Sequence, residues 1–314
     1  MNGGLLTLGE TMALLRPTAP LALEHANELA IGVGGAESNV AIGVARLGLP
    51  SAWIGRVGDD ALGRRVLREL RGESVEVHAR VEVAAPTGLM IKEPVAQVTR
   101  VRYHRYGSAG SMISPEDVDE GMVRLAGVVH VTGITPAISS SAAEAVDRLI
   151  DLAHAFRVPV SFDVNHRSFL WRDRDPSPVY RRLAAKATIV FAGVEEAELL
   201  VGEGSPADLS RRLSQLGPGQ AIVKLGSRGC VSYIDGNFAE VPAIGVTVVD
   251  TVGAGDAFVA GYLTGFLEGR SAAERVDLAV RCGAFACLGP GDWESSPHRS
   301  QLELLNGLGD PVLR

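Results

Sequence analysis

The sequence lacks the features that mark membrane, secreted and disulfide-rich proteins. Its 314 residues contain no apolar run long enough to span a membrane. The first ten residues, MNGGLLTLGE, have neither a basic start nor a small-residue cleavage site, so no signal peptide is expected. Only three cysteines occur, Cys230, Cys282 and Cys287, without metal-ligand spacing, and we interpret them as reduced core thiols. Together these absences predict a cytoplasmic protein.

An excess of positive charge is also absent. The net charge is -7 and the pI is near 5.6, which disfavours nucleic acid or an anionic membrane as a partner. A phosphate ligand stays possible, because backbone amides can hold one. Hydrophobic residues make up 46% of the chain and charged residues 21%, a balance typical of globular proteins with a sizeable core.

Short β-rich runs alternate with helical patterns, which predicts βαβ units around a mainly parallel sheet. The predicted strands are residues 5–8, 52–55, 128–132, 159–164, 189–191, 221–224 and 231–234. The predicted helices are residues 38–47, 61–70, 141–156, 258–267 and 272–288.

Two stretches, at about 11–33 and 86–107, break this alternation. The second contains residues 88–92 and 98–106, whose patterns suit an antiparallel pair of strands. We expect both stretches to form a small β-sheet that projects from the main α/β domain, as a lid over a site, an oligomer contact, or both. No linker separates independent domains, so residues 1–314 are interpreted as one domain.

The strongest chemical signal is the run DTVGAGD at residues 250–256. Apolar residues at helical spacing follow it, so Gly253, Ala254 and Gly255 form a small-residue turn at a helix N-terminus. Free amides and the helix dipole there suit a phosphate and the charge that develops during phosphoryl transfer. Asp256 is placed to accept the proton of an attacking hydroxyl. The spacing alone equally allows an Asp that only stabilises its own helix.

Two further glycine-rich runs are weaker signals. In GGAESNVA at residues 34–41, Gly34 and Gly35 let a ligand approach the backbone, and Asn39 supplies donors and an acceptor. A tight turn with a polar cap would explain this run equally simply. The run KLGSRG at residues 224–229 follows an apolar strand, which is where α/β folds bind ligands. A plain β-turn between two strands is the alternative there.

The runs GGAESN and DTVGAGD are similar to the two signatures of ribokinase-like (PfkB-type) carbohydrate kinases, and the resemblance spans nearly the whole chain. It implies a ribokinase-like α/β/α sandwich with a β-sheet lid that often forms a dimer interface, so a homodimer through the lid is expected. It also implies ATP and Mg²⁺ as cofactors, with a monovalent cation as a further candidate. Gly253, Ala254 and Gly255 would form an anion hole, and Asp256 would be the catalytic base.

The loop at residues 224–229 also resembles a family block. Lys224, Gly226 and Gly229 match the Lys-x-Gly-x-x-Gly pattern that contacts the nucleotide in the family. The family often carries Asn-x-x-Glu on the preceding strand, whereas this chain has Gly193 and Glu196 at the matching positions. The resemblance therefore implies that Glu196 acts on Mg²⁺ indirectly, while the family's amide is missing.

Two arginines point to an acidic substrate. If Arg105 in the predicted lid and Arg167 after a core strand both reach the site, two guanidinium groups would suit a carboxylate more than a neutral sugar. The surrounding segments resemble those of 2-keto-3-deoxygluconate kinases. This resemblance implies sugar contacts from Gly34, Tyr103, Arg105, Ile134, Arg167 and Asp292, and phosphate contacts from Asn165 and Arg167.

One position departs from that subfamily. Met90 stands where relatives often have Tyr, which removes one hydrogen bond, on the order of 1 kcal/mol. The predicted activity is ATP-dependent phosphorylation of the terminal hydroxyl of a sugar acid, 2-keto-3-deoxygluconate to its 6-phosphate, or a stereochemical relative. A kinase of the same fold for a fructose- or ribose-type sugar or a nucleoside is the alternative. A non-catalytic sugar-binding regulator is a remote one, supported only by Gly193.

Overall fold

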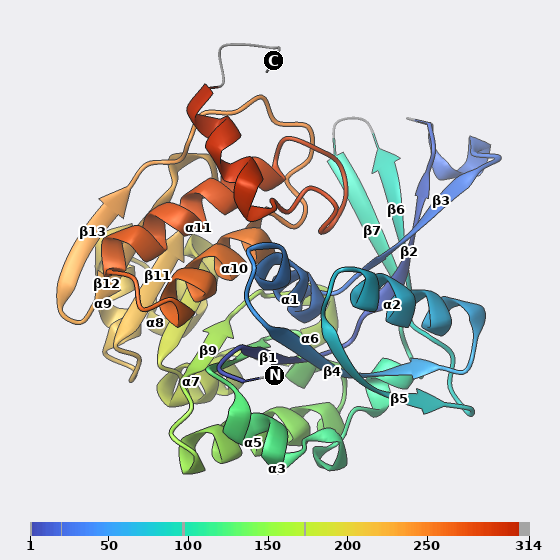
Figure 1. Ribbon diagram of the computed structural model, residues 1–314, viewed down its shortest axis with the longest axis horizontal. Helices are drawn as coiled ribbons and strands as arrows, with labels where there is room; N and C mark the ends of the chain where they lie inside the picture. Colours follow the sequence, from blue (N-terminus) through green and yellow to red (C-terminus); the bar gives the residue numbers. More distant parts are fainter. Residues whose placement is uncertain (1, 20, 96–97, 173, 308–314) are drawn as a thin grey trace.

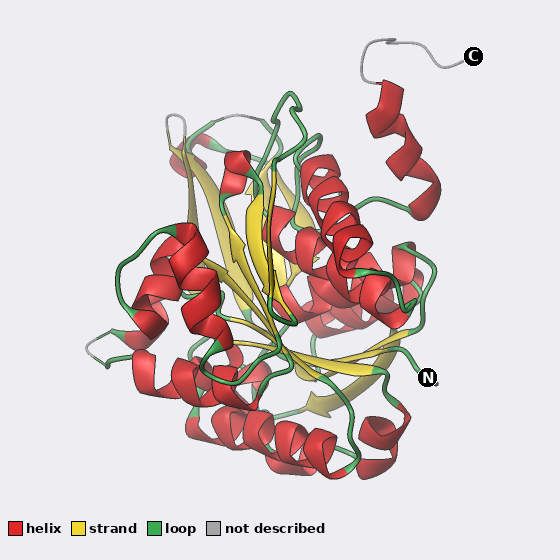
Figure 2. Ribbon diagram, turned by 90° about the vertical axis from the view of Figure 1, so that its left-hand side faces the viewer, coloured by secondary structure: helices red, strands yellow, loops and turns green. Residues whose placement is uncertain are grey.

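The predicted strands assemble into a large central sheet with helices on both faces (Figures 1 and 2). The computed structural model describes residues 2–19, 21–95, 98–172 and 174–307. Within these residues the sheet has nine strands in the order β13-β12-β11-β10-β9-β8-β1-β4-β5. Their bounds are β1 (Leu5–Leu8), β4 (Ser51–Gly58), β5 (Glu76–Glu82), β8 (Val128–Thr132), β9 (Val160–Asp163), β10 (Ile189–Gly193), β11 (Gln220–Lys224), β12 (Cys230–Ile234) and β13 (Asn237–Val241).

The neighbours from β5 to β11 pair in parallel, and only β12 and β13 add antiparallel pairs. The predicted mainly parallel sheet is therefore confirmed. The sequence did not predict β5 or β13. Both lie at sheet edges. β13 is exposed over most of its length and shows no apolar alternation, whereas in β5 Val77, Ala79 and Val81 alternate with polar residues, so a signal of a half-buried strand was available in the sequence.

Helices cover the two faces of this sheet. One face carries α1 (Ala36–Arg46), α2 (Ala61–Gly72), α10 (Ala254–Leu267) and α11 (Ala272–Ala286). The other carries α3 (Glu120–Leu125), α5 (Ser140–Ala155), α7 (Ser177–Lys186), α8 (Val194–Val201) and α9 (Pro206–Ser214). All five predicted helices are present, although α10 begins four residues earlier than the range 258–267, at Ala254.

Alternation along each strand divides the core into two layers. In β1, Leu5 packs towards α1 and α10, while Leu6 and Leu8 pack towards α5. This follows from the period of two in a strand. Cys230 and Cys282 lie in the core as predicted, whereas Cys287 is only half-buried, and all three are free thiols. No helix in the described part of the chain has the length and apolarity needed to cross a bilayer.

A second, four-stranded sheet projects from the main one, and we call it the lid (Figure 1). Its order is β3-β2-β6-β7, with β6 and β7 antiparallel as predicted. Its strands are β2 (Met12–Pro17), β3 (Leu29–Gly34), β6 (Leu89–Val95) and β7 (Val98–His104). Both stretches singled out in the sequence therefore supply lid strands.

The chain enters the β6–β7 hairpin at Thr87, which is fixed to the main domain by Asp60. The Asp60 carboxylate caps α2 by accepting from Gly63 N at 2.7 Å, and it also accepts from Thr87 N at 2.8 Å and Thr87 Oγ1 at 2.9 Å. One carboxylate thus joins a helix N-terminus to the root of a lid strand.

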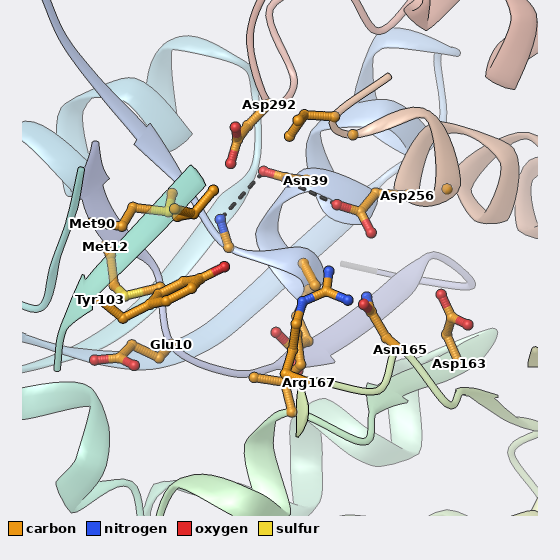
Figure 3. Close-up of a pocket in the computed structure, with 18 of the residues that line it drawn as sticks. Glu10, Met12, Asn39, Met90, Tyr103, Asp163, Asn165, Arg167, Asp256 and Asp292 are labelled. Atoms are coloured by element: carbon orange, nitrogen blue, oxygen red, sulfur yellow. Dashed lines mark hydrogen bonds between the residues drawn. The ribbon is translucent and has the colours of Figure 1, made fainter. Parts of the chain in front are cut away.

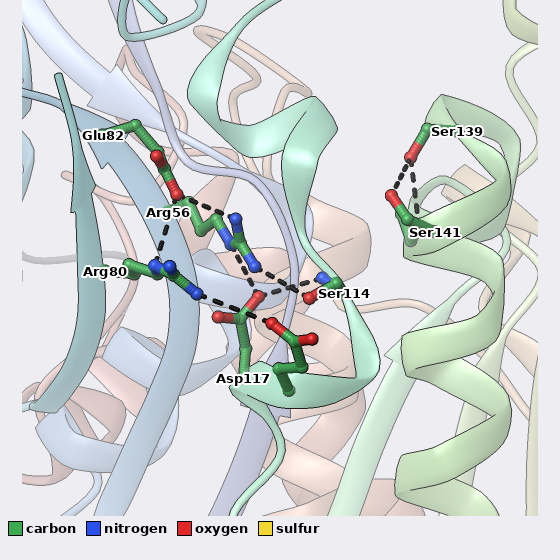
Figure 4. Close-up of polar contacts among 9 residues, drawn as sticks. Arg56, Arg80, Glu82, Ser114, Asp117, Ser139 and Ser141 are labelled. Carbon is green, nitrogen blue, oxygen red and sulfur yellow. Dashed lines mark hydrogen bonds and ion pairs between the residues drawn. The ribbon is translucent and has the colours of Figure 1, made fainter. Parts of the chain in front are cut away.

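The chain leaves the hairpin through a segment held by Arg56 of β4. Arg56 donates to Asp117 at 2.7 Å, to Glu82 at 2.8 Å and to Ser114 Oγ at 2.8 Å (Figure 4). The Arg56 side chain is only 7% exposed. Both roots of the hairpin are therefore attached to the main sheet through buried polar groups.

Replacing Arg56 by Leu should strongly destabilise the protein, because the Asp117 carboxylate would stay buried without its cation and Glu82 would keep only the exposed Arg80, at 3.5 Å. Breaking one side of a buried pair costs about 3–5 kcal/mol. Urea unfolding would measure the loss. Arg64→Leu is the control, because that side chain is 68% exposed and its loss should cost less than about 1 kcal/mol. Similar losses in both variants would contradict the structural role of Arg56.

Candidate active site

A polar cavity of about 550 Å³ lies where the lid meets the main sheet. The carboxyl ends of the parallel strands form its floor: Glu10 follows β1, Ile134 follows β8, Asp163 ends β9 and Lys224 ends β11. The lid contributes Met12, Met90, Lys92, Val101 and Tyr103 to the opposite wall. Ligand sites in α/β sheets usually occupy this position.

An apolar cavity of about 420 Å³ adjoins the polar one. The two share Lys224, Thr251 and Gly255 in their walls. Phe258 and Cys287 help to line the apolar cavity, together with residues of the loop at 243–248. Two connected spaces, one polar and one apolar, can hold two ligands that meet at the N-terminus of α10.

The backbone geometry at the N-terminus of α10 restricts which residue can stand there. Gly253 has φ of 77°, in the left-handed region, and a side chain there would collide with the carbonyl oxygen of Asp292. Glycine is therefore required at this N-cap. The following amides of Ala254 and Gly255 belong to the first helical turn, where backbone N–H groups lack helical acceptors. This arrangement can receive an anion.

Asp256, the third residue of α10, is held by Asn39 of α1. Asn39 Nδ2 donates to Asp256 Oδ2 at 2.8 Å, and Asn39 Oδ1 accepts from Gly35 N at 3.4 Å (Figure 3). Burial raises the pKa of Asp256 to about 7, and the nearby Asp163 adds to this, while Asn39, Arg167 and Lys224 oppose it. A carboxyl that titrates near neutral pH suits general base catalysis.

Lys224 stands between the two cavities and is paired with Asp163. Its ammonium contacts the two oxygens of Asp163 at 2.7 and 2.9 Å. Burial works against the charged ammonium, but the carboxylates of Asp163 and Glu196 outweigh it, so the pKa of Lys224 is raised. A fixed cation therefore lies beside the N-terminus of α10.

Glu196 has both carboxylate oxygens occupied by backbone donors. It accepts from Gly193 N at 2.6 Å, which caps α8, and from His166 N at 2.8 Å. Glu196 also lines the polar cavity. Its first task is thus to fix the loop after β9 against the start of α8, and any contact with a metal would be additional to this.

Arg105 lies in the wall of the polar cavity but is already paired. It is buried, and its Nε donates to Glu10 Oε2 at 2.7 Å. Ser108 Oγ donates to the other oxygen of Glu10. The predicted carboxylate-binding arginine therefore carries its own counter-ion, which the sequence did not indicate.

Arg167 carries no such counter-ion among the residues that the structure describes. Its guanidinium donates to the carbonyl of His166 at 3.1 Å and lies beside Asn165 at the cavity (Figure 3). Asn165 has φ of 39°, a backbone region that Asn tolerates better than most residues. This turn directs the side chains of Asn165 and Arg167 to the cavity.

The lid side of the cavity is partly apolar. Met12 and Met90 are buried there, and Tyr103 stacks on Phe169 with ring centres 4.6 Å apart. Gly34 packs directly against Met90 and Asp292, so that any side chain at position 34 would collide with both. The Asp292 carboxylate forms an ion pair with Lys92 of β6.

Another buried carboxylate, Glu37 of α1, also lines the polar cavity. It accepts from Thr132 Oγ1 at 2.7 Å and from Thr135 Oγ1 at 2.6 Å. Burial raises its pKa, although these hydroxyls oppose the shift. The contacts join α1 to the loop that follows β8, and so they position Ile134.

Most of the residues predicted from sequence meet at these cavities. Those that line the polar cavity are Gly35, Asn39, Tyr103, Arg105, Ile134, Asn165, Arg167, Glu196, Lys224, Gly253, Gly255, Asp256 and Asp292. Gly226, Gly229 and Ala254 line the apolar cavity instead. The residues that sequence reasoning missed are Glu10, Glu37, Lys92 and Asp163. For Lys92 a signal existed, because it lies two positions after Met90 in a predicted strand and so shares its face.

Comparison with known proteins gives a consistent result. Residues 4–299 match the model of the pfkB family carbohydrate kinases. The 2-dehydro-3-deoxygluconokinase of Bacillus subtilis is 36% identical over 94% of this chain and 93% of its own. The 2-dehydro-3-deoxygalactonokinase of Haloferax volcanii is 32% identical over 90% and 89%. The crystal structure of the PfkB protein from Polaromonas sp. JS666 is similar with a TM-score of 0.87, at 35% identity over 96% of this chain and 99% of that one.

Asp256→Asn should make the fold more stable above pH 7, because Asn imitates the protonated carboxyl. Between about pH 4 and pH 7 the folded wild type retains a proton that its unfolded chain releases, so its stability falls as pH rises. The gain in the free energy of unfolding is at most about 4 kcal/mol, and water in the cavity will make it smaller. Urea unfolding at about pH 5 and pH 8 tests this.

The control for this measurement is Asp151→Asn, because the Asp151 side chain is 61% exposed. It should show no comparable dependence on pH. If Asp256→Asn gained no stability between pH 5 and pH 8 relative to this control, the pKa of Asp256 would not be raised in the folded state.

Proposed function

The chain belongs to the pfkB family of carbohydrate kinases and is a sugar kinase; we propose that it transfers the γ-phosphoryl group of ATP to the terminal hydroxyl of 2-keto-3-deoxygluconate. The observation that carries the proposal is a carboxyl at the N-terminus of α10, placed where a polar and an apolar cavity join. The named relatives from Bacillus subtilis and Haloferax volcanii support a 2-keto-3-deoxy sugar acid.

The apolar cavity suits the nucleotide. Its wall of Phe258, Val280 and small residues offers apolar surface to a purine base. The phosphates would then extend towards the shared wall, where Lys224 supplies a positive charge and the first turn of α10 supplies amides. Gly226, beside which the space is open, would let the nucleotide approach the backbone, whereas Gly229 is needed for close packing against the backbone of residues 241–243.

The residues that line the polar cavity fit Mg²⁺ only as an ion that is bound to the phosphates of the nucleotide. Within the described residues, no cluster of three or more His, Cys, Asp or Glu side chains could hold a metal ion. Asp163 is paired with Lys224, and Glu196 accepts from two backbone amides. Glu196 would therefore touch Mg²⁺ through water, which agrees with the missing amide at Gly193. When bound, the ion would neutralise charge on the phosphates.

Asp256 is the proposed base. Its carboxylate would accept the proton of the sugar's terminal hydroxyl as that oxygen attacks the γ-phosphorus, while the bond to the leaving ADP oxygen breaks. Asn39 orients the carboxylate through its 2.8 Å hydrogen bond. The amides of Gly253, Ala254 and Gly255 would stabilise the charge on the transferring group.

Arg167 is the proposed anchor for the substrate carboxylate. Among the described residues it has no carboxylate partner, whereas Arg105, Lys92 and Lys224 each have one. A guanidinium binds a carboxylate through two parallel hydrogen bonds. Arg105 keeps N–H groups for the substrate, but its charge is balanced by Glu10, so Arg167 should contribute more to selectivity for acids.

A neutral-sugar kinase on the same fold is the alternative, and Met90 favours it, because it replaces a phenol that relatives use. One kinase domain over residues 1–314, a homodimer through the lid and a requirement for a monovalent cation stay predictions.

A substrate panel with ATP and Mg²⁺ tests the proposal directly. The panel contains 2-keto-3-deoxygluconate, 2-keto-3-deoxygalactonate, fructose, ribose and adenosine. The highest kcat/KM is expected for one of the two 2-keto-3-deoxy acids. A preference for fructose, ribose or adenosine would overturn the sugar-acid assignment.

Asp256→Asn should lower kcat by about 100- to 10,000-fold, because a positioned general base contributes that much. ATP affinity, measured by calorimetry, should change little. In the wild type, kcat/KM should fall as pH drops below about 7, where Asp256 becomes protonated. A near-normal kcat in the variant, with Asp151→Asn as the control, would show that Asp256 is not the base.

Arg167→Met should reduce kcat/KM for the sugar acid by about 10- to 100-fold, because a charge-assisted hydrogen bond is lost. The reduction for a neutral substrate such as fructose should be smaller. Arg174→Met is the matched control, since Arg174 lies in the following segment and contacts the carbonyls of Ala137 and Leu170. Equal reductions for acid and neutral sugars would exclude Arg167 as the carboxylate anchor.

A further inference from the structure

Lys92 and Asp292 form an ion pair at the seam between the lid and the main domain. Lys92 comes from β6, and Asp292 from the loop that follows α11. The two side chains are only 7% and 9% exposed, yet both line the polar cavity. In Figure 3, Asp292 lies on the lid side of the cavity, near Met90. Asp292 is a predicted sugar contact, whereas Lys92 has no part in the proposed phosphoryl transfer.

The hydrogen-bonding groups of Lys92 and Asp292 are not all used. Besides its ion-pair contact with Asp292 Oδ1, Lys92 Nζ has no hydrogen-bond partner among the described residues, although an ammonium has three donors. A buried ion pair recovers its desolvation cost only when further hydrogen bonds complete it. The second oxygen of Asp292 lies against Gly34, which has no side chain to cover it. Lys92 Nζ is itself covered, so the second oxygen of Asp292 is the group that a polyhydroxylated ligand in the cavity could reach.

The loop that carries Asp292 is held both by the main domain, through Arg46, and by the lid strand β3, through Val33. Arg46 donates to the carbonyls of Trp293 and Glu294 at 3.1 and 3.0 Å, and Trp293 Nε1 donates to the carbonyl of Val33 at 2.9 Å. Asp292 N donates to the Glu294 carboxylate at 2.8 Å. With the loop backbone fixed in this way, the ion pair with Lys92 orients the Asp292 carboxylate and stabilises its charged form.

We propose that Lys92 is a positioning residue for the sugar: it holds the Asp292 carboxylate charged and oriented so that the free oxygen accepts a hydrogen bond from a sugar hydroxyl. Because Lys92 belongs to the lid, this hydroxyl is bound well only when the lid is in place. The inference rests on the proposed function only in that a sugar occupies the polar cavity. It does not require the sugar to be an acid.

The electrostatic surroundings of Asp292 give the proposal a specific signature. Burial raises the pKa of Asp292, Lys92 opposes this, and the carboxylates of Glu294 and Asp250 raise it further. Without Lys92, burial and two neighbouring carboxylates would act unopposed, so Asp292 would take up a proton at a higher pH. A protonated Asp292 is a weaker acceptor, and sugar binding would therefore weaken as pH falls.

The test is Lys92→Met, measured with whichever sugar the wild type phosphorylates best. The KM for the sugar should rise about 10- to 100-fold, and more at about pH 6 than at about pH 8. The kcat and the KM for ATP should change far less. Lys92→Arg should restore most of the sugar affinity, because it retains the charge. The control is Arg102→Met, since Arg102 is on the neighbouring strand, 55% exposed and paired with Glu93.

A second variant keeps the test decisive if Lys92→Met is poorly folded. Adding Lys92→Met to Asp292→Asn should raise the sugar KM no further, because the carboxylate on which Lys92 acts is gone. A pH-independent loss shared by kcat and both KM values, or additive losses in the double variant, would overturn the proposal and leave Lys92 a purely structural role. Failure of the proposed function is distinct, because the substrate panel on the wild type would then show a preferred substrate other than a 2-keto-3-deoxy acid, whatever the Lys92 variants do.

Discussion

The site depends on the meeting of two helix N-termini, those of α1 and α10, at the floor of the cavity. The contact between them is the 2.8 Å hydrogen bond from Asn39 to Asp256, which joins residues 217 positions apart. The helices can approach this closely because position 43 is glycine; a Cβ there would lie 2.6 Å from that of Ala260. The same approach buries Asp256 and raises its pKa. Positioning and basicity of this carboxyl thus have one structural cause.

Burying so many charges around one cavity is tolerable because most of them are paired across elements. Arg105 pairs with Glu10, Lys224 with Asp163, and Lys92 with Asp292. Each pair joins segments that are far apart in the sequence, so the pairs hold the cavity wall together as well as neutralise it. Against this background, an arginine without a carboxylate partner, Arg167, is where an added anion would be most strongly attracted.

The sequence predicted the parts of this site that depend on local patterns. The glycine turn before Asp256 and the strands at 128–132 and 189–191 have short-range signals, and the structure contains them. The pairing of Arg105 with Glu10 could not be predicted, because nothing local links residues 95 positions apart. The edge strand β13 was missed for a different reason: it is exposed, and no hydrophobic alternation marks it. Family resemblance supplied residue roles, but it did not reveal which cations are already neutralised.

The attachment of the lid limits how it can move and therefore where selectivity can arise. Its β6–β7 hairpin is fixed at one root by Asp60 and at the other by Arg56, and β2 follows β1 after only three residues. Because β3 also leads into α1 through Gly35 alone, the lid is attached at all four of its chain connections and cannot leave the site without breaking buried polar contacts. Small tilts would change the distances across the seam where Lys92 meets Asp292. Discrimination between similar sugars is therefore expected from contacts across that seam rather than from the ordering of a loop.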